Sequence, residues 1–456
     1  MKQNKAMRKL ALVSVLALSV AGCAKEEILD GLREDIRSSD YDVNDPNAVA
    51  AATEAAAQLD APFENQSRPT NLGPVVTQAS WPLRGANAAH NLPNATLSSS
   101  PSVIWSARAG EGNSKRNRIT AEPVSDGANV FVMDSHTTVS AIGMGGAAGW
   151  SVDISAEGET AGRGIGGGLA LGDGKLFATS TYGELVALDP STGDVLWRQR
   201  FNASVSGAPT VVGQQVFVVT DNSEAYAINT NTGRIDWQLT GLASQYGVAA
   251  VAAPAVSGNT VLMPLSNGSL LGVDSRSGTV KFVSRMLGGR RGSGHAALQD
   301  FTGEPVVVGG VIYAANAAGQ TQAISLAGGQ TRWSVEEGAQ GSIAVAGGSL
   351  YFVNDQGKLL RLSAQNGDKI WSIDLPHYEK EDNLRRRKSI YPGFGPVMAG
   401  GRLWVASGDG FLRAFDPTDG SQVASIELPE GAASRPITVA GKMFVMGEKG
   451  NLLALR

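Results

Sequence analysis

Residues 183–197 read GELVALDPSTGDVLW, and nearly the same pattern returns as SEAYAINTNTGRIDW at 223–237 and as GKLLRLSAQNGDKIW at 357–371. Each copy has a short apolar run, a polar turn that contains glycine, and a second run that ends in tryptophan. Short apolar runs separated by Gly, Asn and Asp are typical of antiparallel β-strands. The pattern therefore predicts a structure built from repeated copies of one small β-sheet unit.

These copies belong to a longer repeat that starts near residue 100. Short apolar runs recur at 130–133, 176–179, 216–219, 261–264, 311–315, 350–353, 403–406 and 443–446. Most of them are followed by a polar turn, a second strand, a turn with glycine and a third strand. A repeat of roughly 40–50 residues with about four strands is typical of a propeller blade. The sequence predicts an all-β protein, an eight-bladed β-propeller with four-stranded antiparallel blades.

A tryptophan four residues after a glycine sets the register of the repeat. The pairs are Gly146 and Trp150, Gly193 and Trp197, Gly233 and Trp237, Gly329 and Trp333, and Gly367 and Trp371. Phe282 and Ala424 hold the tryptophan position in the fourth and seventh units. The eighth unit stops before its last strand, whereas an isolated strand at 102–107 contains Trp105. We expect that N-terminal strand to complete the last blade and close the ring, and the six tryptophans to pack between blades.

The N-terminus has the pattern of a bacterial export signal. Four basic residues precede an apolar run at 10–20, which is shorter than the roughly 20 residues of a membrane-spanning helix. Cys23, the only cysteine, follows SVAG, and this stretch resembles the lipobox of bacterial lipoproteins. The resemblance implies cleavage after Gly22 and lipidation of Cys23. Because Ala24 follows the cysteine, it also implies sorting to the outer membrane.

Three regions are expected along the chain: a signal peptide at 1–22, a lipid-anchored flexible tether at 23–80, and the propeller at 81–456. Much of the tether is rich in Ala, Pro, Asn and Gln, without a sustained apolar period. Removal of the signal peptide takes away four basic residues and changes the net charge from −4 to −8. That acidic balance argues against nucleic acid as a partner.

The A-x-D-x-x-T-G-x-x-x-W pattern resembles the tryptophan-docking motif of the pyrroloquinoline-quinone (PQQ)-like eight-bladed propellers. The segment SWPLRGANAAHN at 80–91 also resembles a leading segment of the quinoprotein dehydrogenases that share this fold. Those enzymes usually carry a vicinal disulfide on the quinone and a Ca²⁺ ion held beside a catalytic aspartate. A chain with one cysteine cannot form that disulfide, and we expect no cofactor here.

No other motif indicates catalysis or a metal site. GRGIGG at 162–167 satisfies G-x-G-x-x-G, but a strand is expected after it, whereas a dinucleotide site needs a helix. The four histidines are far apart in the sequence and match no metal-ligand spacing; they are His90, His136, His295 and His377. Nucleophile-elbow and phosphate-loop patterns do not occur. We expect a protein that is not an enzyme.

The lipobox, the Gly–Trp repeats and a last blade that ends GNLLALR at 450–456 together resemble the BamB family of lipoproteins. The resemblance implies a non-catalytic scaffold subunit of the outer-membrane β-barrel assembly machinery, on the periplasmic face of the outer membrane. Such a subunit binds the POTRA domains of the barrel-forming core subunit and assists insertion of unfolded outer-membrane proteins. Two alternatives stay open: a PQQ-dependent dehydrogenase and a ligand-binding propeller lipoprotein.

In that family the partner surface lies on loops between consecutive blades in the middle of the chain. The loop SQYGVAA at 244–250 places Tyr246 and Val248 at the family's apolar pair, whereas Ala249 replaces an expected arginine. These departures leave the detailed contacts of this loop open.

The next inter-blade loop spans 288–305 and carries an acidic pair in the family. Asp300 matches one member of the pair, whereas Thr302 replaces the other. Arg290 and Arg291 in this loop either supply a basic partner contact or form a solvated loop tip.

A later insertion carries four consecutive basic residues, 385–388. On an acidic body this run either faces anionic lipid head groups or an acidic partner, or is simply solvated.

Overall fold

The computed structural model describes residues 63–159, 166–241, 252–286, 289–290, 300–316, 318–379 and 389–456. The chain divides into two units, Met1–Glu64 and Asn65–Arg456. Almost all described residues belong to the second unit, and within them every regular element is a β-strand.

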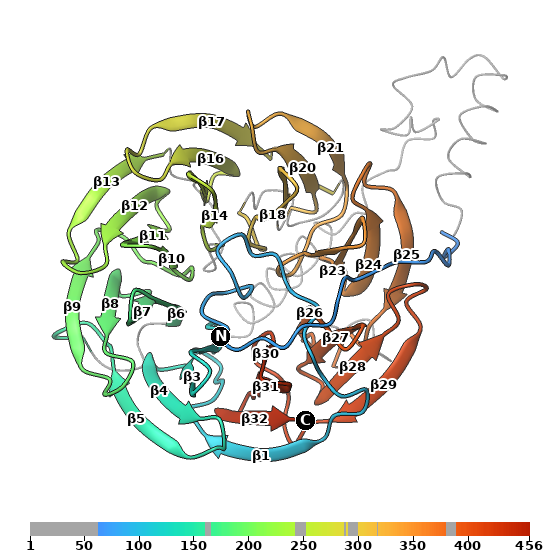
Figure 1. Cartoon of the computed structure of the whole chain (residues 1–456), viewed down its shortest axis with the longest axis horizontal. Helices are drawn as coiled ribbons and strands as arrows, with labels where there is room; N and C mark the ends of the chain where they lie inside the picture. Colours follow the sequence, from blue (N-terminus) through green and yellow to red (C-terminus); the bar gives the residue numbers. More distant parts are fainter. Residues whose placement is uncertain are drawn as a thin grey trace, which may run out of the picture. The chain divides into compact units, whose positions relative to one another are not determined.

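The second unit is a ring of eight four-stranded antiparallel blades, which confirms the predicted fold (Figure 1). The first strand of each blade lies nearest the centre of the ring and the last lies at the rim. The first four blades comprise β2 (Val124–Ser125), β3 (Asn129–Met133), β4 (Thr138–Gly143) and β5 (Ala148–Asp153); β6 (Gly166–Gly172), β7 (Lys175–Ser180), β8 (Glu184–Leu188) and β9 (Val195–Arg200); β10 (Thr210–Val212), β11 (Gln215–Val219), β12 (Glu224–Asn229) and β13 (Ile235–Thr240); and β14 (Ala255–Ser257), β15 (Thr260–Pro264), β16 (Ser269–Asp274) and β17 (Val280–Arg285).

The remaining blades continue in the same order, and the last one uses both ends of the propeller sequence. They comprise β18 (Val306–Val308), β19 (Val311–Ala315), β20 (Thr321–Ser325) and β21 (Thr331–Val335); β22 (Ala344–Ala346), β23 (Ser349–Val353), β24 (Lys358–Ser363) and β25 (Lys369–Asp374); β26 (Gly393–Ala399), β27 (Arg402–Ser407), β28 (Phe411–Phe415) and β29 (Gln422–Glu427); and β30 (Ile437–Val439), β31 (Lys442–Met446), β32 (Asn451–Leu455) and β1 (Val103–Arg108). Strand β1 pairs antiparallel with β32, with Trp105 opposite Ala454. The N-terminal strand thus closes the ring.

The sequence of each strand reflects how its blade is packed. The two middle strands of a blade are buried on both faces because neighbouring blades cover both sides, so they are nearly continuous apolar runs, as in β8. The rim strands, such as β9, are buried on one face only and alternate between more and less exposed side chains.

The repeated tryptophans join each blade to the next. A Cβ atom added to Gly193, which has φ +81°, would lie 2.5 Å from the ring of Trp150, so only glycine lets the indole lie flat on that turn. The Trp150 Nε1 atom donates to the carbonyl of Pro190 at 2.9 Å. The same bond recurs from Trp197 to Thr230 (2.9 Å), Trp237 to Ser275 (2.8 Å), Trp333 to Ala364 (3.1 Å) and Trp371 to Pro417 (3.2 Å).

Phe282 takes the place of the tryptophan against Gly329, and the other exceptions lie next to the closing blade. Ala424 belongs to the blade before it, and strands β32 and β1 have no hairpin turn that could receive a tryptophan, because they come from opposite ends of the sequence. On the other side, Trp105 lies against Gly146, but its Nε1 atom has no hydrogen-bond partner among the described residues. In the other blades the tryptophan donates to a carbonyl at the start of the hairpin turn. The equivalent carbonyl for Trp105 is that of Met144, which instead accepts a hydrogen bond from Lys442 Nζ at 2.9 Å.

The segment before β1 crosses the middle of the ring (Figure 1). Its backbone bonds to inner strands of several blades, with Trp81 paired to Ser125, Pro82 to Leu171, Ala88 to Val256, Ala89 to Val307 and Ala95 to Met398. Trp81 and Ala95 are fully buried.

Docking onto the ring begins well before residue 81. The backbone N–H groups of Gln66 and Arg68 donate to the carbonyls of Ile370 and Thr418. Residues 65–80, expected as tether, therefore lie on the propeller. The attachment uses backbone groups and polar side chains such as that of Asn65, which bonds to Ser372, and these leave no apolar pattern in the sequence.

Candidate partner-binding surface

The topology places the connections between blades on one face of the ring. Because strands within a blade are antiparallel, the inter-blade connections and the turn between second and third strands share a face, and the other two turns lie on the opposite face. The N-terminal segment covers that opposite face, since Gln78 and Ala95 accept bonds from the turns at Ala440 and Gly400. The connection face is left for other contacts.

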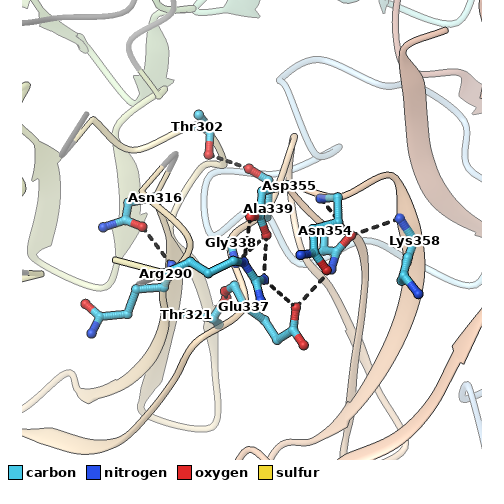
Figure 2. Close-up of polar contacts among 12 residues, drawn as sticks. Arg290, Thr302, Asn316, Thr321, Glu337, Gly338, Ala339, Asn354, Asp355 and Lys358 are labelled. Carbon is cyan, nitrogen blue, oxygen red and sulfur yellow. Dashed lines mark hydrogen bonds and ion pairs between the residues drawn. The ribbon is translucent and has the colours of Figure 1, made fainter. Parts of the chain in front are cut away.

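Arg290 lies on this face, at the root of the connection between β17 and β18, and it is not a solvated tip. Its guanidinium binds Asp355 with two hydrogen bonds, Nε to Oδ2 at 3.1 Å and Nη2 to Oδ1 at 3.0 Å, and Glu337 Oε2 at 3.0 Å (Figure 2). Its backbone N–H donates to the carbonyl of Ala318 at 2.7 Å. Arg290 thus fastens this connection to the next two blades.

The carboxylates that hold Arg290 are themselves fixed. Glu337 also pairs with Lys369 at 2.5 Å and accepts a hydrogen bond from Asn354 Nδ2 at 2.9 Å. Burial alone would lower the pKa of Arg290, but the hydrogen bonds and charge of Asp355, together with Glu337, outweigh it and raise that pKa. The arginine is therefore held permanently charged between two acidic side chains.

Asp300 is also at the root of this connection, and it is buried, with 1% of its surface exposed. Thr302 donates a hydrogen bond to the carbonyl of Ala339. Because Asp300 is buried and Arg290 is paired within the ring, we expect charge reversal at either residue to destabilise the fold as well as alter the surface. Whether Asp300 contacts a partner stays a prediction.

Other predicted positions lie outside the described residues. These are Cys23, Tyr246, Val248, Arg291 and the basic run 385–388.

A cluster of buried charges in the middle of the ring was not predicted. Arg84, from the N-terminal segment, pairs with Glu122 at 3.1 Å and also with Glu304. Arg435 pairs with Glu122 at 2.7 Å. Two cations thus balance two carboxylates, and the cluster links three blades to the segment that crosses them.

His90 is buried beside this cluster. Burial is the main cause that lowers its pKa to about 3; the charges of Arg435 and Arg84 act in the same direction, whereas the hydrogen bond with the carbonyl of Pro305 opposes the shift. The imidazole is therefore neutral across the physiological range.

The repeat does contain a signal for these charges. Three blades have a charged residue directly before the proline that precedes the inner strand, Glu122, Glu304 and Arg435, whereas Ala208 and Ala253 occupy that position in two others. A charge at a repeat position that other blades fill with a small residue marks the middle of the ring.

Two of the motifs considered above can be compared with the structure. After GRGIGG the chain forms strand β6, where a dinucleotide site would need a helix. Within the described residues, no group of three or more His, Cys, Asp or Glu side chains is arranged to hold a metal ion. In the same part of the chain, no helix is long and apolar enough to cross a membrane.

These features define the chain as an eight-bladed propeller of the tryptophan-docking class, closed by its N-terminal strand. A family model described as "Outer membrane protein assembly factor BamB" matches residues 135–373 and 380–456. The chain belongs to the BamB family.

Individual relatives agree with this assignment. The chain is 26% identical over 369 residues to the outer membrane protein assembly factor BamB of Yersinia pestis, covering 80% of this chain and 91% of that protein. It is 23% identical to BamB of Escherichia coli K12, covering 63% and 83%.

Solved structures share the fold across different functions. BamB from Moraxella catarrhalis matches with a TM-score of 0.63 at 20% identity, covering 78% of this chain and 99% of that one. A quinohemoprotein alcohol dehydrogenase from Comamonas testosteroni matches with a TM-score of 0.62 at 15% identity, covering 84% and 81%. At such identities the likeness shows the fold alone.

Proposed function

We propose that this chain is a non-catalytic scaffold subunit of the outer-membrane β-barrel assembly machinery. The family match over most of the propeller carries this proposal. In it, the chain is anchored by lipid on Cys23 at the periplasmic face of the outer membrane. It binds the POTRA domains of the core subunit and assists insertion of unfolded outer-membrane proteins.

The contact surface in this proposal is the connection face of the ring. Tyr246 and Val248 supply apolar contacts, and the connection fastened by Arg290 supplies polar ones. The anchored arginine supports this view, because a binding loop is more effective when its root is held rigidly. Arg290 therefore positions its connection, while Arg291 is the candidate for direct contact.

The middle of the ring also fits a scaffold. The N-terminal segment crosses it and buries Trp81 there, and the charges of the central cluster are already balanced within the chain. In this propeller, the chain's own side chains therefore occupy the centre of the ring.

The proposal is tested by affinity purification of the tagged, lipidated protein from membranes. Wild type and the double variant Tyr246→Asp, Val248→Asp are compared for recovery of the core subunit. We expect the variant to lose the core subunit while its thermal melt stays unchanged. The control is Val283→Asp, because Val283 lies on the rim strand β17 with 52% of its surface exposed. Purification of this variant should recover as much core subunit as purification of wild type. Equal recovery by all three proteins refutes the proposed surface.

A further inference from the structure

A separate concave site opens on the connection face, between the closing blade and its two neighbours. Its volume is about 360 Å³, at the lower end of the range of roughly 300–1,000 Å³ for ligand pockets. One wall is apolar and comes from Ile119, Tyr391 and Phe394. Charged side chains from three different segments complete the lining, Arg118, Glu379 and Glu448.

Backbone hydrogen bonds fix the walls of this cavity. The N–H of Asn113 donates to the carbonyl of Glu448 at 2.6 Å, and the N–H of Glu448 donates to Gly431 at 2.7 Å. On the other wall, the N–H of Gly408 donates to the carbonyl of Pro392 at 3.0 Å. The segments around the cavity are thus tied to one another, so the site is formed before any ligand arrives.

Glu448 is the acidic side chain of the lining that is best placed to bind a ligand. It is half-buried, and no salt bridge among the described residues joins its carboxylate to a cation, although the charge of Arg118 acts on it. Two glycines make room for it, since a Cβ atom on Gly431 would lie 2.9 Å from Oε2 and one on Gly408 would lie 3.4 Å from Oε1. Because this carboxylate is only partly hydrated, a cation that approaches it is bound more strongly than at a fully exposed carboxylate.

The surroundings of Glu448 favour a positive charge. Burial raises the pKa of Glu448, Arg118 opposes this shift, and Glu379 and Glu430 add to it. Glu430 differs from Glu448 because its own carboxylate already accepts hydrogen bonds from the Lys449 N–H and Asn451 Nδ2. The lining therefore carries one negative charge more than its single arginine balances.

We propose that this cavity binds a basic side chain, arginine or lysine, presented by a partner polypeptide. Both side chains combine an apolar stem with a charged head, which matches an apolar wall beside an unpaired carboxylate. The stem lies on Tyr391 and Phe394, and the head pairs with Glu448 and Glu379. The site opens on the face that carries the proposed contact loops, where a polypeptide partner has access.

The binding chemistry can be tested on the purified, full-length chain alone. N-acetyl-arginine amide is titrated while the methyl resonances of Ile119 and Ile390 are followed by NMR, and the uncharged citrulline analogue is titrated in parallel. We expect wild type to prefer arginine by about tenfold or more, and Glu448→Gln to lose the preference, because one partner of the charge pair is gone. The matched control is Glu427→Gln, an exposed carboxylate on rim strand β29, which should keep it. Equal binding of arginine and citrulline by wild type overturns the proposal.

The source of the basic side chain is tested in membranes. A photo-crosslinking residue at position 390, where the isoleucine is 47% exposed, is compared in wild type and Glu448→Gln backgrounds. We expect a crosslink to a separate polypeptide that Glu448→Gln removes. A crosslink only to the chain's own residues 380–388 overturns the assignment to a partner. A Glu448-dependent crosslink to a polypeptide outside the barrel-assembly machinery would leave this inference standing while the proposed function fails.

Discussion

At the scale of single residues, the repeated tryptophans join the blades through the same pair of contacts, a ring on a glycine and an indole N–H on a carbonyl. Their burial differs around the ring, however. Trp371 is fully buried, whereas Trp197 is partly exposed. The same substitution should therefore cost different amounts at the two positions.

Trp371→Ala is expected to lower the free energy of unfolding by about 3–5 kcal/mol, because it leaves an inter-blade cavity. Trp197→Ala should cost less, and exposed Val283→Ala should stay within about 0.5 kcal/mol of wild type. Urea unfolding of the three variants measures this order. Equal stability of Trp371→Ala and Val283→Ala would contradict the docking role.

His90 makes stability depend on pH in a defined window. The unfolded imidazole has a pKa near 6.5, whereas the buried one has a pKa of about 3. As the pH falls below 6.5 the unfolded state takes up the proton first, so the folded state loses stability, down to about pH 3. Between pH 7 and pH 5, we expect the free energy of unfolding of His90→Gln to fall by about 2 kcal/mol less than that of wild type. Parallel pH profiles would show that His90 is not buried as neutral imidazole.

At the scale of elements, Arg290 shows why the sequence of a loop alone does not predict whether its side chains are solvated or anchored to the ring. The letters GGRRG suit a solvated tip as well as an anchor. The outcome depends on Asp355 and Glu337, which other blades bring to the arginine from 65 and 47 residues away. Arg84 presents the same difficulty, because its partners are spread over different blades.

The Arg290 anchor can be measured by a double-mutant cycle. Arg290→Met and Asp355→Asn should each destabilise the ring by about 1–3 kcal/mol, and the double variant should cost less than their sum because both remove one interaction. The control is the exposed ion pair of Lys358 and Asp374, whose removal by Lys358→Met should cost less than about 1 kcal/mol. Additive effects in the cycle would show that Arg290 and Asp355 act independently.

At the scale of the whole molecule, the repeat in the sequence was enough to predict eight blades, their register and closure by the strand that contains Trp105. These features follow from local periodicity, which can be read from a single sequence. The attachment of residues 65–80, the balanced charges in the middle of the ring and the burial of Asp300 were not predicted. They depend on backbone bonds and on pairs of residues that only the closed ring brings together.

The proposed anchor makes a prediction for the intact cell. Cys23→Ser should prevent lipidation and leave an uncleaved or miscleaved signal peptide. Mass spectrometry and fractionation should then show altered mass and loss of the protein from outer membranes. Unchanged mass and unchanged fractionation would refute the lipobox.

The most direct measurement of the scaffold role is binding between the purified, full-length chain and the isolated POTRA domains of the core subunit from the same organism. Titration calorimetry should show saturable binding that Tyr246→Asp with Val248→Asp abolishes and Val283→Asp preserves. Absence of binding by wild type, together with stoichiometric uptake of quinone in the presence of Ca²⁺ and reduction of a dye by an alcohol or sugar, would contradict the scaffold and favour the dehydrogenase.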